Sequence, residues 1–266
     1  MAGVLAGVAF LAIVFLLESQ HFQEIALLIR PRHPEAIRSQ SRLERGLGNV
    51  TVSLIAAFLN MIIATFLYAA LSGEDILGPR AETLGFIAAI SLCVGFLNLL
   101  YGIVWLLETR ELALPAAVAR TIAALVAPAV TFAFIALRAL DMRAVAEGHR
   151  ATRSWVGVLL LCLLATMIVL FTVSGRWRKS EVRVRLTSQL AVRLTAYAAL
   201  AIGVLTVVAT AFVSQLSVSY AVPRWGVAAV MAALFLAYCA YIILVGAVDD
   251  LDADALPQPP TELAQP

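Results

Sequence analysis

Seven apolar runs, separated by short polar gaps, decide what this chain can fold into. They lie at about residues 2–22, 50–71, 84–107, 112–137, 155–173, 189–213 and 225–248. A helix of roughly 20 apolar residues crosses the ~30 Å hydrocarbon core of a bilayer. The chain is 62% hydrophobic, whereas soluble domains are about 45–50% apolar. We therefore expect an all-α polytopic membrane protein, with a bundle of seven transmembrane helices in residues 1–248.

The two ends of the chain differ in character. No Lys or Arg precedes the first apolar run, and no A-x-A cleavage site follows it. The pattern therefore favours a retained helix over a removed signal peptide. Residues 249–266 are acidic, rich in proline and free of aromatic residues. That composition is typical of a disordered segment, and we expect a cytoplasmic tail there.

Basic residues in the gaps predict the orientation. With the N-terminus outside, the inner gaps carry 11 Lys and Arg and the outer gaps carry 6. Loops facing the cytoplasm are enriched in basic residues. We therefore expect an integral protein of the plasma (inner) membrane, with its N-terminus outside and its C-terminus in the cytoplasm. The outer gap at residues 138–153 holds four of the outer arginines and is expected to be a loop.

Two of the inner gaps, residues 30–48 and 175–188, are rich in arginine. We interpret each as a solvated loop or short interfacial helix at the anionic lipids of the cytoplasmic leaflet. Pro31 and Pro34 end any helix that enters the first gap. The basic surface is too small to predict nucleic-acid binding, while a membrane-protein partner or a homo-oligomer remains open. The predicted lipid-contacting residues are Arg30, Arg32, Arg176, Trp177, Arg178 and Lys179.

The fourth run, residues 112–137, has three runs on each side and contains Arg120 and two prolines. Pro115 fits the first turn of a helix, where proline is tolerated. Pro128 is interior and predicts a kink, because proline removes a backbone donor. The kink is interpreted either as static or as a hinge whose released carbonyls face a cavity.

Parts of the second and sixth runs resemble each other. Residues 62–72 read IIATFLYAALS and residues 207–217 read VVATAFVSQLS, and each stretch is followed by a Pro-Arg pair. One interpretation is a three-plus-one-plus-three parallel repeat, as occurs in transporters. The other is coincidence among apolar letters. The layout resembles the SWEET sugar-transporter fold in the order of its spans alone; no motif of that family occurs, and no family is identified.

Polar residues inside the spans predict one candidate site. Arg120 lies eight residues into its span, roughly 12 Å deep at 1.5 Å per residue, and other polar residues lie in the same half of the membrane. Intramembrane polar residues often mark function. The alternative is that the arginines extend to the inner headgroups. The predicted substrate or ion pocket, opening to the cytoplasm, comprises Glu18, His21, Asn98, Arg120, Arg193 and Tyr238.

Cofactor and enzyme signatures are weak. Glu18 and His21 form a single E-x-x-H, whereas di-iron bundles use two such motifs and two further Glu. The only lysine, Lys179, lies in a gap, so no Schiff base to retinal is expected, and three scattered cysteines form no metal-binding pattern. Ser91 and Cys93 have no His or Asp nearby in the sequence to act as a base. We predict no metal and no cofactor, and we consider an enzyme less favoured.

Two functions remain in balance from the sequence. The first is a transporter or channel for a small solute or ion, supported by the repeat, the kinked fourth span and the intramembrane charges. The second is a non-transporting sensor, regulator or assembly subunit of a larger membrane complex, supported by the lack of a recognisable site. An intramembrane enzyme ranks third. A transporter or channel needs a continuous polar cavity that reaches mid-membrane, whereas a non-transporting subunit does not.

Overall fold

The fold is taken from a computed structural model of the whole chain. It describes residues 34–74, 78–109, 113–147 and 188–247, with single helical residues between 7 and 14 and between 165 and 172. Within these residues every regular element is a helix. The helices are α2 Pro34–Leu71, α3 Pro79–Thr109, α4 Ala113–Thr121, the π-helix η1 Ile122–Val126, α5 Ala127–Glu147, α7 Ser188–Ser214 and α8 Arg224–Ala247.

Five spans in the described part of the chain are long and apolar enough to cross a membrane. This is the architecture of an integral membrane protein. The spans confirm the second, third, fourth, sixth and seventh predicted helices. The first and fifth predicted spans fall outside the described residues, so the count of seven stays a prediction. The five are Gly48–Leu71, Pro79–Leu107, Leu114–Ala146, Val192–Ser214 and Arg224–Leu244.

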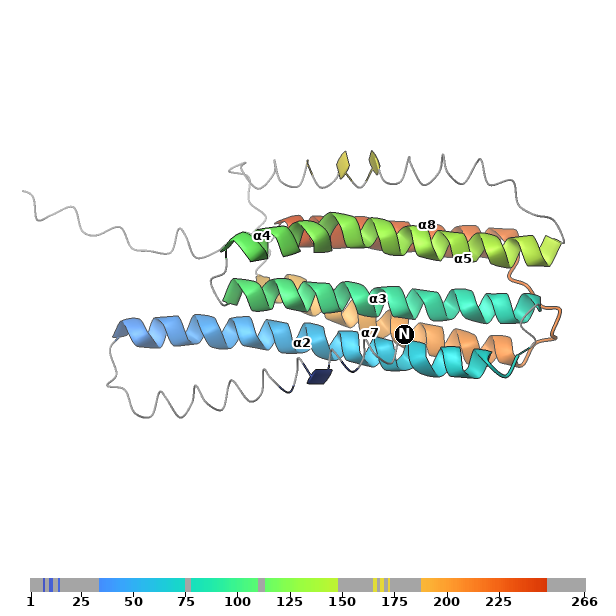
Figure 1. The fold of residues 1–266 in the computed structure, drawn as a ribbon, viewed down its shortest axis with the longest axis horizontal. Coiled ribbons are helices and arrows are strands. Elements are labelled where there is room, and N and C mark those ends of the chain that lie inside the picture. Colours follow the sequence, from blue (N-terminus) through green and yellow to red (C-terminus); the bar gives the residue numbers. More distant parts are fainter. Residues whose placement is uncertain are drawn as a thin grey trace, which may run out of the picture.

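The long helices lie side by side along one axis (Figure 1). Helices α2, α4–α5 and α7 run in one direction, and α3 and α8 run in the other. We call one end of the bundle the turn end, because the α2–α3 and α7–α8 turns and the last residues of α5 lie there. We call the other the tail end, because α8 ends there. Helix α5 finishes at the turn end, and α7 starts at the tail end.

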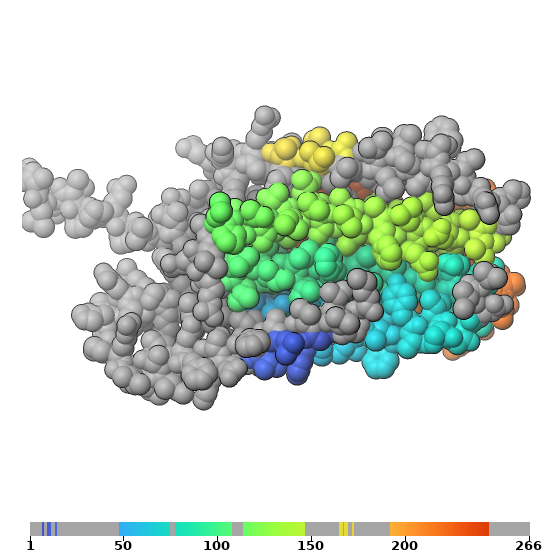
Figure 2. Space-filling model, viewed as in Figure 1, coloured from blue at the N-terminus to red at the C-terminus, as the bar shows by residue number. Residues whose placement is uncertain are grey.

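Helix α3 is the centre of the described bundle. It contacts α2, α4, η1, α5 and α7, and it lies between α2 and α5 on the face seen in Figure 2. In the span of α3, 78% of the most apolar stretch is buried, against 28% in α7 and in α8. The last two helices therefore leave most of their apolar surface to lipid or to parts of the protein outside the described residues.

Glycines on α3 let α2 approach closely. A Cβ on Gly95 would lie 3.2 Å from the carbonyl oxygen of Ala57, and one on Gly102 would lie 2.8 Å from Leu54 Cδ2. Both glycines are buried. Helices in lipid associate through close packing and hydrogen bonds rather than through hydrophobic burial. The seven-residue spacing of these glycines keeps them on the same side of α3, and this side is the one that meets α2.

Two gaps between the predicted spans are partly helical: residues 30–48, expected to form a loop or a short interfacial helix, and residues 138–153, expected to form a loop. Helix α2 already begins at Pro34, and α5 continues to Glu147. Proline is tolerated in a first helical turn, and the residues after Pro34 are mostly good helix formers, so nothing stops the helix before the membrane span. At 38 residues, α2 is about 57 Å long, well beyond the hydrocarbon thickness.

The fourth span is interrupted near its middle, as Pro128 predicted, but by a π-helix rather than by a simple kink. The N–H of Ala127 donates to the carbonyl of Ile122, five residues back. A regular α-helix would also need an N–H at position 128, which proline lacks. Such π segments are rare and often occur at functional sites. This one contacts α3 and α8.

Candidate functional site

Helices α2 and α3 are joined by a reciprocal pair of hydrogen bonds. Ser53 of α2 donates its hydroxyl to the backbone carbonyl of Asn98 at 2.8 Å. Ser91 of α3 donates its hydroxyl to the backbone carbonyl of Asn60 at 3.0 Å. All four residues are buried. We call this set, Ser53, Asn60, Ser91 and Asn98, the serine–asparagine seam.

The seam rests on a short sequence repeat. Residues 53–60 read SLIAAFLN and residues 91–98 read SLCVGFLN. In each copy the asparagine amide donates to the carbonyl four residues back, Ala56 at 2.9 Å and Val94 at 3.0 Å. Because the helices are antiparallel, the serine of each copy meets the asparagine of the other. The two copies are therefore related by a local twofold axis perpendicular to the helices, and their pairing is self-complementary.

Asn60 also joins the seam to α7. Its amide donates to the carbonyl of Ala199 at 3.1 Å. Its amide oxygen lies against Gly203, where an added Cβ would come within 2.6 Å of that oxygen. The amide oxygens of both Asn60 and Asn98 accept no hydrogen bond from a described residue. Asn60 thus connects three helices through one side chain, and only glycine fits opposite it.

A second polar cluster lies where the interrupted fourth helix packs against α3 and α8. Cys93 of α3 directs its thiol to the carbonyl of Thr131 at 3.8 Å. The hydroxyl of Thr131 lies 2.6 Å from the carbonyl of Ala127 and 3.2 Å from that of Pro128. These are the bonds to carbonyls four and three residues back that helical threonines commonly make, and they occupy the Thr131 donor at the start of α5. We call the surroundings of Cys93, Thr131 and Tyr238 the π-helix site.

Tyr238 brings α8 into this site. Its ring packs edge-on against Phe132, with the centroids 5.7 Å apart, and the side chain is 3% exposed. Cys93 and Thr131 are its polar neighbours. The Tyr238 hydroxyl lies within reach of the Thr131 hydroxyl but makes no well-formed hydrogen bond with the described residues. A buried hydroxyl without a well-formed hydrogen bond is energetically unfavourable by about 1–3 kcal/mol.

Four residues of the predicted pocket are described, and they occupy different settings. Asn98 and Tyr238 are buried, Arg120 is half-buried and Arg193 is exposed. Tyr241, one turn from Tyr238, donates to the carbonyl of Leu97 at 3.4 Å, which places α8 beside Asn98. Arg120 lies eleven residues before Thr131, about 16 Å towards the tail end. Asn98 and Tyr238 therefore lie at neighbouring levels, and Arg120 lies nearer the tail end.

The remaining predicted residues are outside the described part of the chain. Glu18 and His21 belong to this group, so the cytoplasm-facing pocket stays a prediction. The six predicted lipid-contacting residues and the tail, residues 249–266, also stay predictions. The lipid-contacting residues are Arg30, Arg32, Arg176, Trp177, Arg178 and Lys179.

Sequence reasoning missed the seam and most of the π-helix site. Ser91 and Cys93 were considered only as nucleophiles, and no spacing argument joined them to Asn60 or to Tyr238. The signal for the seam was the SLxxxFLN repeat, five identical positions of eight, in two neighbouring spans. No comparable signal pointed to Thr131, whose neighbours depend on the rotation of the helix after the π turn.

Comparisons with known proteins add no family. No protein-family model matches the chain, and searches of curated proteins and of solved structures find no match. The functional argument therefore rests on the geometry of this chain alone.

Proposed function

We propose that the protein transports a small solute or ion, and that the π-helix site lies on its path. The observation that carries the proposal is the interrupted fourth helix, packed on α3 and α8 beside the buried hydroxyls of Tyr238 and Thr131. Non-helical backbone at membrane depth is tolerated where it is enclosed by protein or lines a water-filled cavity. Transporters commonly build their sites near the bilayer midplane from interrupted helices.

The chemistry at the π-helix site favours a small polar or cationic solute. The groups available are a phenol hydroxyl, a threonine hydroxyl and backbone carbonyls, with the aromatic faces of Tyr238 and Phe132 beside them. Oxygen acceptors and aromatic faces favour donors and cations.

A non-transporting subunit is the second candidate. It is favoured by the large apolar surface of α7, where Tyr197, Leu205 and Phe212 are 65%, 65% and 64% exposed. Contiguous exposed surface of this kind suits a protein partner within the membrane as well as lipid. This candidate needs no water near the π-helix site, whereas a transporter does.

Cys93 is a native reporter that separates the two. Cys162 and Cys239 are first replaced by alanine, which leaves Cys93 as the only thiol. The purified protein, reconstituted in vesicles, is then treated from each side with a small, charged, water-soluble thiol reagent. Transport predicts that Cys93 is modified from at least one side, and that Tyr238→Phe, which removes only the hydroxyl, leaves the fold intact. If Cys93 is modified only after detergent denaturation, the site is dry and the transport proposal is wrong.

A further inference from the structure

Every carbonyl at the end of α7 has a donor, and the last donor comes from another helix. The hydroxyl of Ser214 bonds to Ala211 at 2.9 Å, and the N–H groups of Gln215 and Leu216 bond to Phe212 and Val213 at 3.2 and 3.0 Å. The carbonyl of Ser214 itself receives Arg80 of α3 at 3.4 Å. The final four carbonyls of a helix have no partner within it, so Arg80 completes the end of α7.

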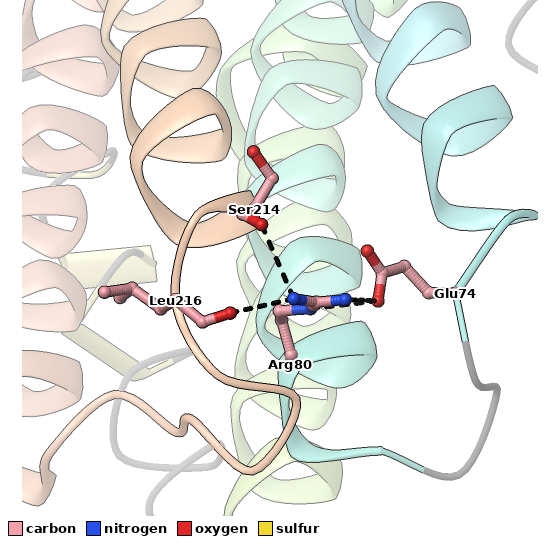
Figure 3. A network of polar contacts seen from close by, with 4 residues as sticks. All are labelled: Glu74, Arg80, Ser214 and Leu216. Carbon is pink, nitrogen blue, oxygen red and sulfur yellow. Dashed lines mark hydrogen bonds and ion pairs between the residues drawn. The ribbon is translucent and has the colours of Figure 1, made fainter.

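Arg80 is held by three groups at once (Figure 3). Besides Ser214, it donates to the carbonyl of Leu216 at 2.8 Å. Its Nε and Nη2 donate to one carboxylate oxygen of Glu74 at 2.9 and 2.7 Å. The Arg80 and Glu74 side chains are 18% and 16% exposed, so water screens this pair only partly. A guanidinium suits such a place, because its planar group of donors serves several acceptors together.

A second arginine holds the other side of the same turn. Arg143 of α5 donates to the carbonyl of Val222, just before α8 begins, at 3.1 Å. The α7–α8 turn is thus tied to α3 by Arg80 and to α5 by Arg143. These are the two helices that, with α8, surround the π-helix site.

Among the described helices, α8 is the least enclosed wall of that site. Only 28% of its span is buried, and its contacts with α5, η1 and α7 are sparse beside those between α2 and α3. A helix with few contacts moves at low energetic cost, whereas a close-packed pair does not. Along its length α8 is held by the hydrogen bond from Tyr241 to Leu97 of α3 and by the ring contacts of Phe132 with Phe235 and Tyr238. The α7–α8 turn is its attachment at the turn end.

We propose that Arg80 and Arg143 form a gate at the turn end: while they bind the α7–α8 turn, α8 stays closed over the π-helix site, and their release opens the site to water from that end. This gate rests on the proposed transport function, because it assumes that water reaches the π-helix site. Opening breaks no covalent bond; it exchanges these hydrogen bonds with water, together with the long ones from the Arg80 N–H to Val218 and from Tyr241 to Leu97, each 3.4 Å. Arginine-anchored interfaces of this kind switch between discrete arrangements rather than deform gradually.

The test measures the rate at which Cys93, as the only thiol, reacts with an impermeant cationic thiol reagent added at the turn end. Arg80→Gln removes the charge and most of the hydrogen bonds while keeping a similar length. The rate should rise about tenfold, since losing hydrogen bonds to a charged group shifts a two-state equilibrium by about that factor. Arg143→Gln should raise the rate less, and the double variant should raise it most. Arg80→Lys, which keeps the charge but cannot serve three acceptors together, should fall between wild type and Arg80→Gln.

The matched control is Asp141→Asn, which removes an exposed charge from the same end of α5. It should leave the rate unchanged. If Arg80→Gln does not fold, Arg80→Lys and Arg143→Gln carry the test. Equal rates for wild type and all arginine variants, with modification seen from the tail end, overturn the gate and leave the transport proposal standing. No modification from either end in any variant overturns both.

Discussion

The serine–asparagine seam and the π-helix site contain the same kinds of residue and treat them differently. In the seam, two regular helices meet at glycine, and each serine donates to a carbonyl of the opposite helix. In the π-helix site, one helix is interrupted, and the hydroxyl of Tyr238 is buried without a hydrogen bond to a described residue. Both regions hold buried polar atoms without a well-formed hydrogen bond to a described residue: the amide oxygens of Asn60 and Asn98 in the seam, and the hydroxyl of Tyr238 in the π-helix site. They differ in their backbone, because the seam joins two regular helices whereas the π-helix site lies against an interrupted one. Buried polarity in a membrane helix is thus not itself a sign of a binding site.

The largest stability effect is expected where the seam meets α7. Gly203→Ala would place a methyl group within 2.6 Å of the Asn60 amide oxygen. Overpacking of this kind destabilises by roughly 1–3 kcal/mol. Thermal unfolding in detergent should therefore show a clear fall in Tm. Gly48→Ala is the control, because nothing lies within 4 Å of its added Cβ.

Coupling between the two residues sharpens the same prediction. Asn60→Ala removes the amide that the new methyl group would meet. The double variant Asn60→Ala with Gly203→Ala should therefore be more stable than the sum of the single effects implies, because residues in contact are not additive. Strict additivity would mean that Asn60 and Gly203 do not touch.

The two asparagines should differ, although their sequence copies are alike. Asn60 bonds to its own helix and to Ala199 of α7, whereas Asn98 has only the bond to Val94 through its amide nitrogen. Hydrogen bonds between membrane helices contribute about 0.6 kcal/mol on average and up to about 1.7. Asn60→Ala should destabilise more than Asn98→Ala by about that amount in a chemical unfolding titration. Equal losses would contradict the link to α7.

The two serines should instead behave alike. Each makes one hydrogen bond to the opposite helix, at 2.8 and 3.0 Å. Ser53→Ala and Ser91→Ala should each lower stability by about 0.6 kcal/mol. The double variant should lose about the sum, because the bonds lie seven residues apart on each helix. If the two single variants lose clearly different amounts of stability, the two hydrogen bonds are not energetically equivalent despite the local twofold axis.

Pro128 should affect water access more than stability. Its side chain is fully buried and the π turn already accommodates its missing donor. Pro128→Ala supplies an N–H and permits a regular α-helix. The Tm should change little, while the rate of Cys93 modification should fall. A large loss of stability with an unchanged rate would mean that the proline serves packing only.

The sequence was most informative about spans and least informative about which way their polar residues face. Apolar length alone predicted the described helices, because the bilayer imposes a minimum length. Apolar length did not predict that α2 begins at Pro34. The residues after Pro34 are polar, and they are helical because of their intrinsic helix propensity rather than because a membrane surrounds them. Pro128 predicted an interruption, but not the π turn that sets the face presented by Thr131. Tyr238 and Asn98 were predicted by depth, while their neighbours depended on helix rotation, which composition does not encode.

The most direct test compares one thiol in each region. Ser91 and Cys93 are two residues apart on α3, and face the seam and the π-helix site respectively. In a background without Cys162 and Cys239, the native Cys93 is compared with Ser91→Cys carried together with Cys93→Ala. Both are treated in vesicles with the same small charged thiol reagent. Cys93 should react at least about tenfold faster, the ratio given by a difference of ~1.4 kcal/mol in water access. Equal rates, or faster reaction at position 91, would contradict the distinction between a closed seam and a water-accessible site.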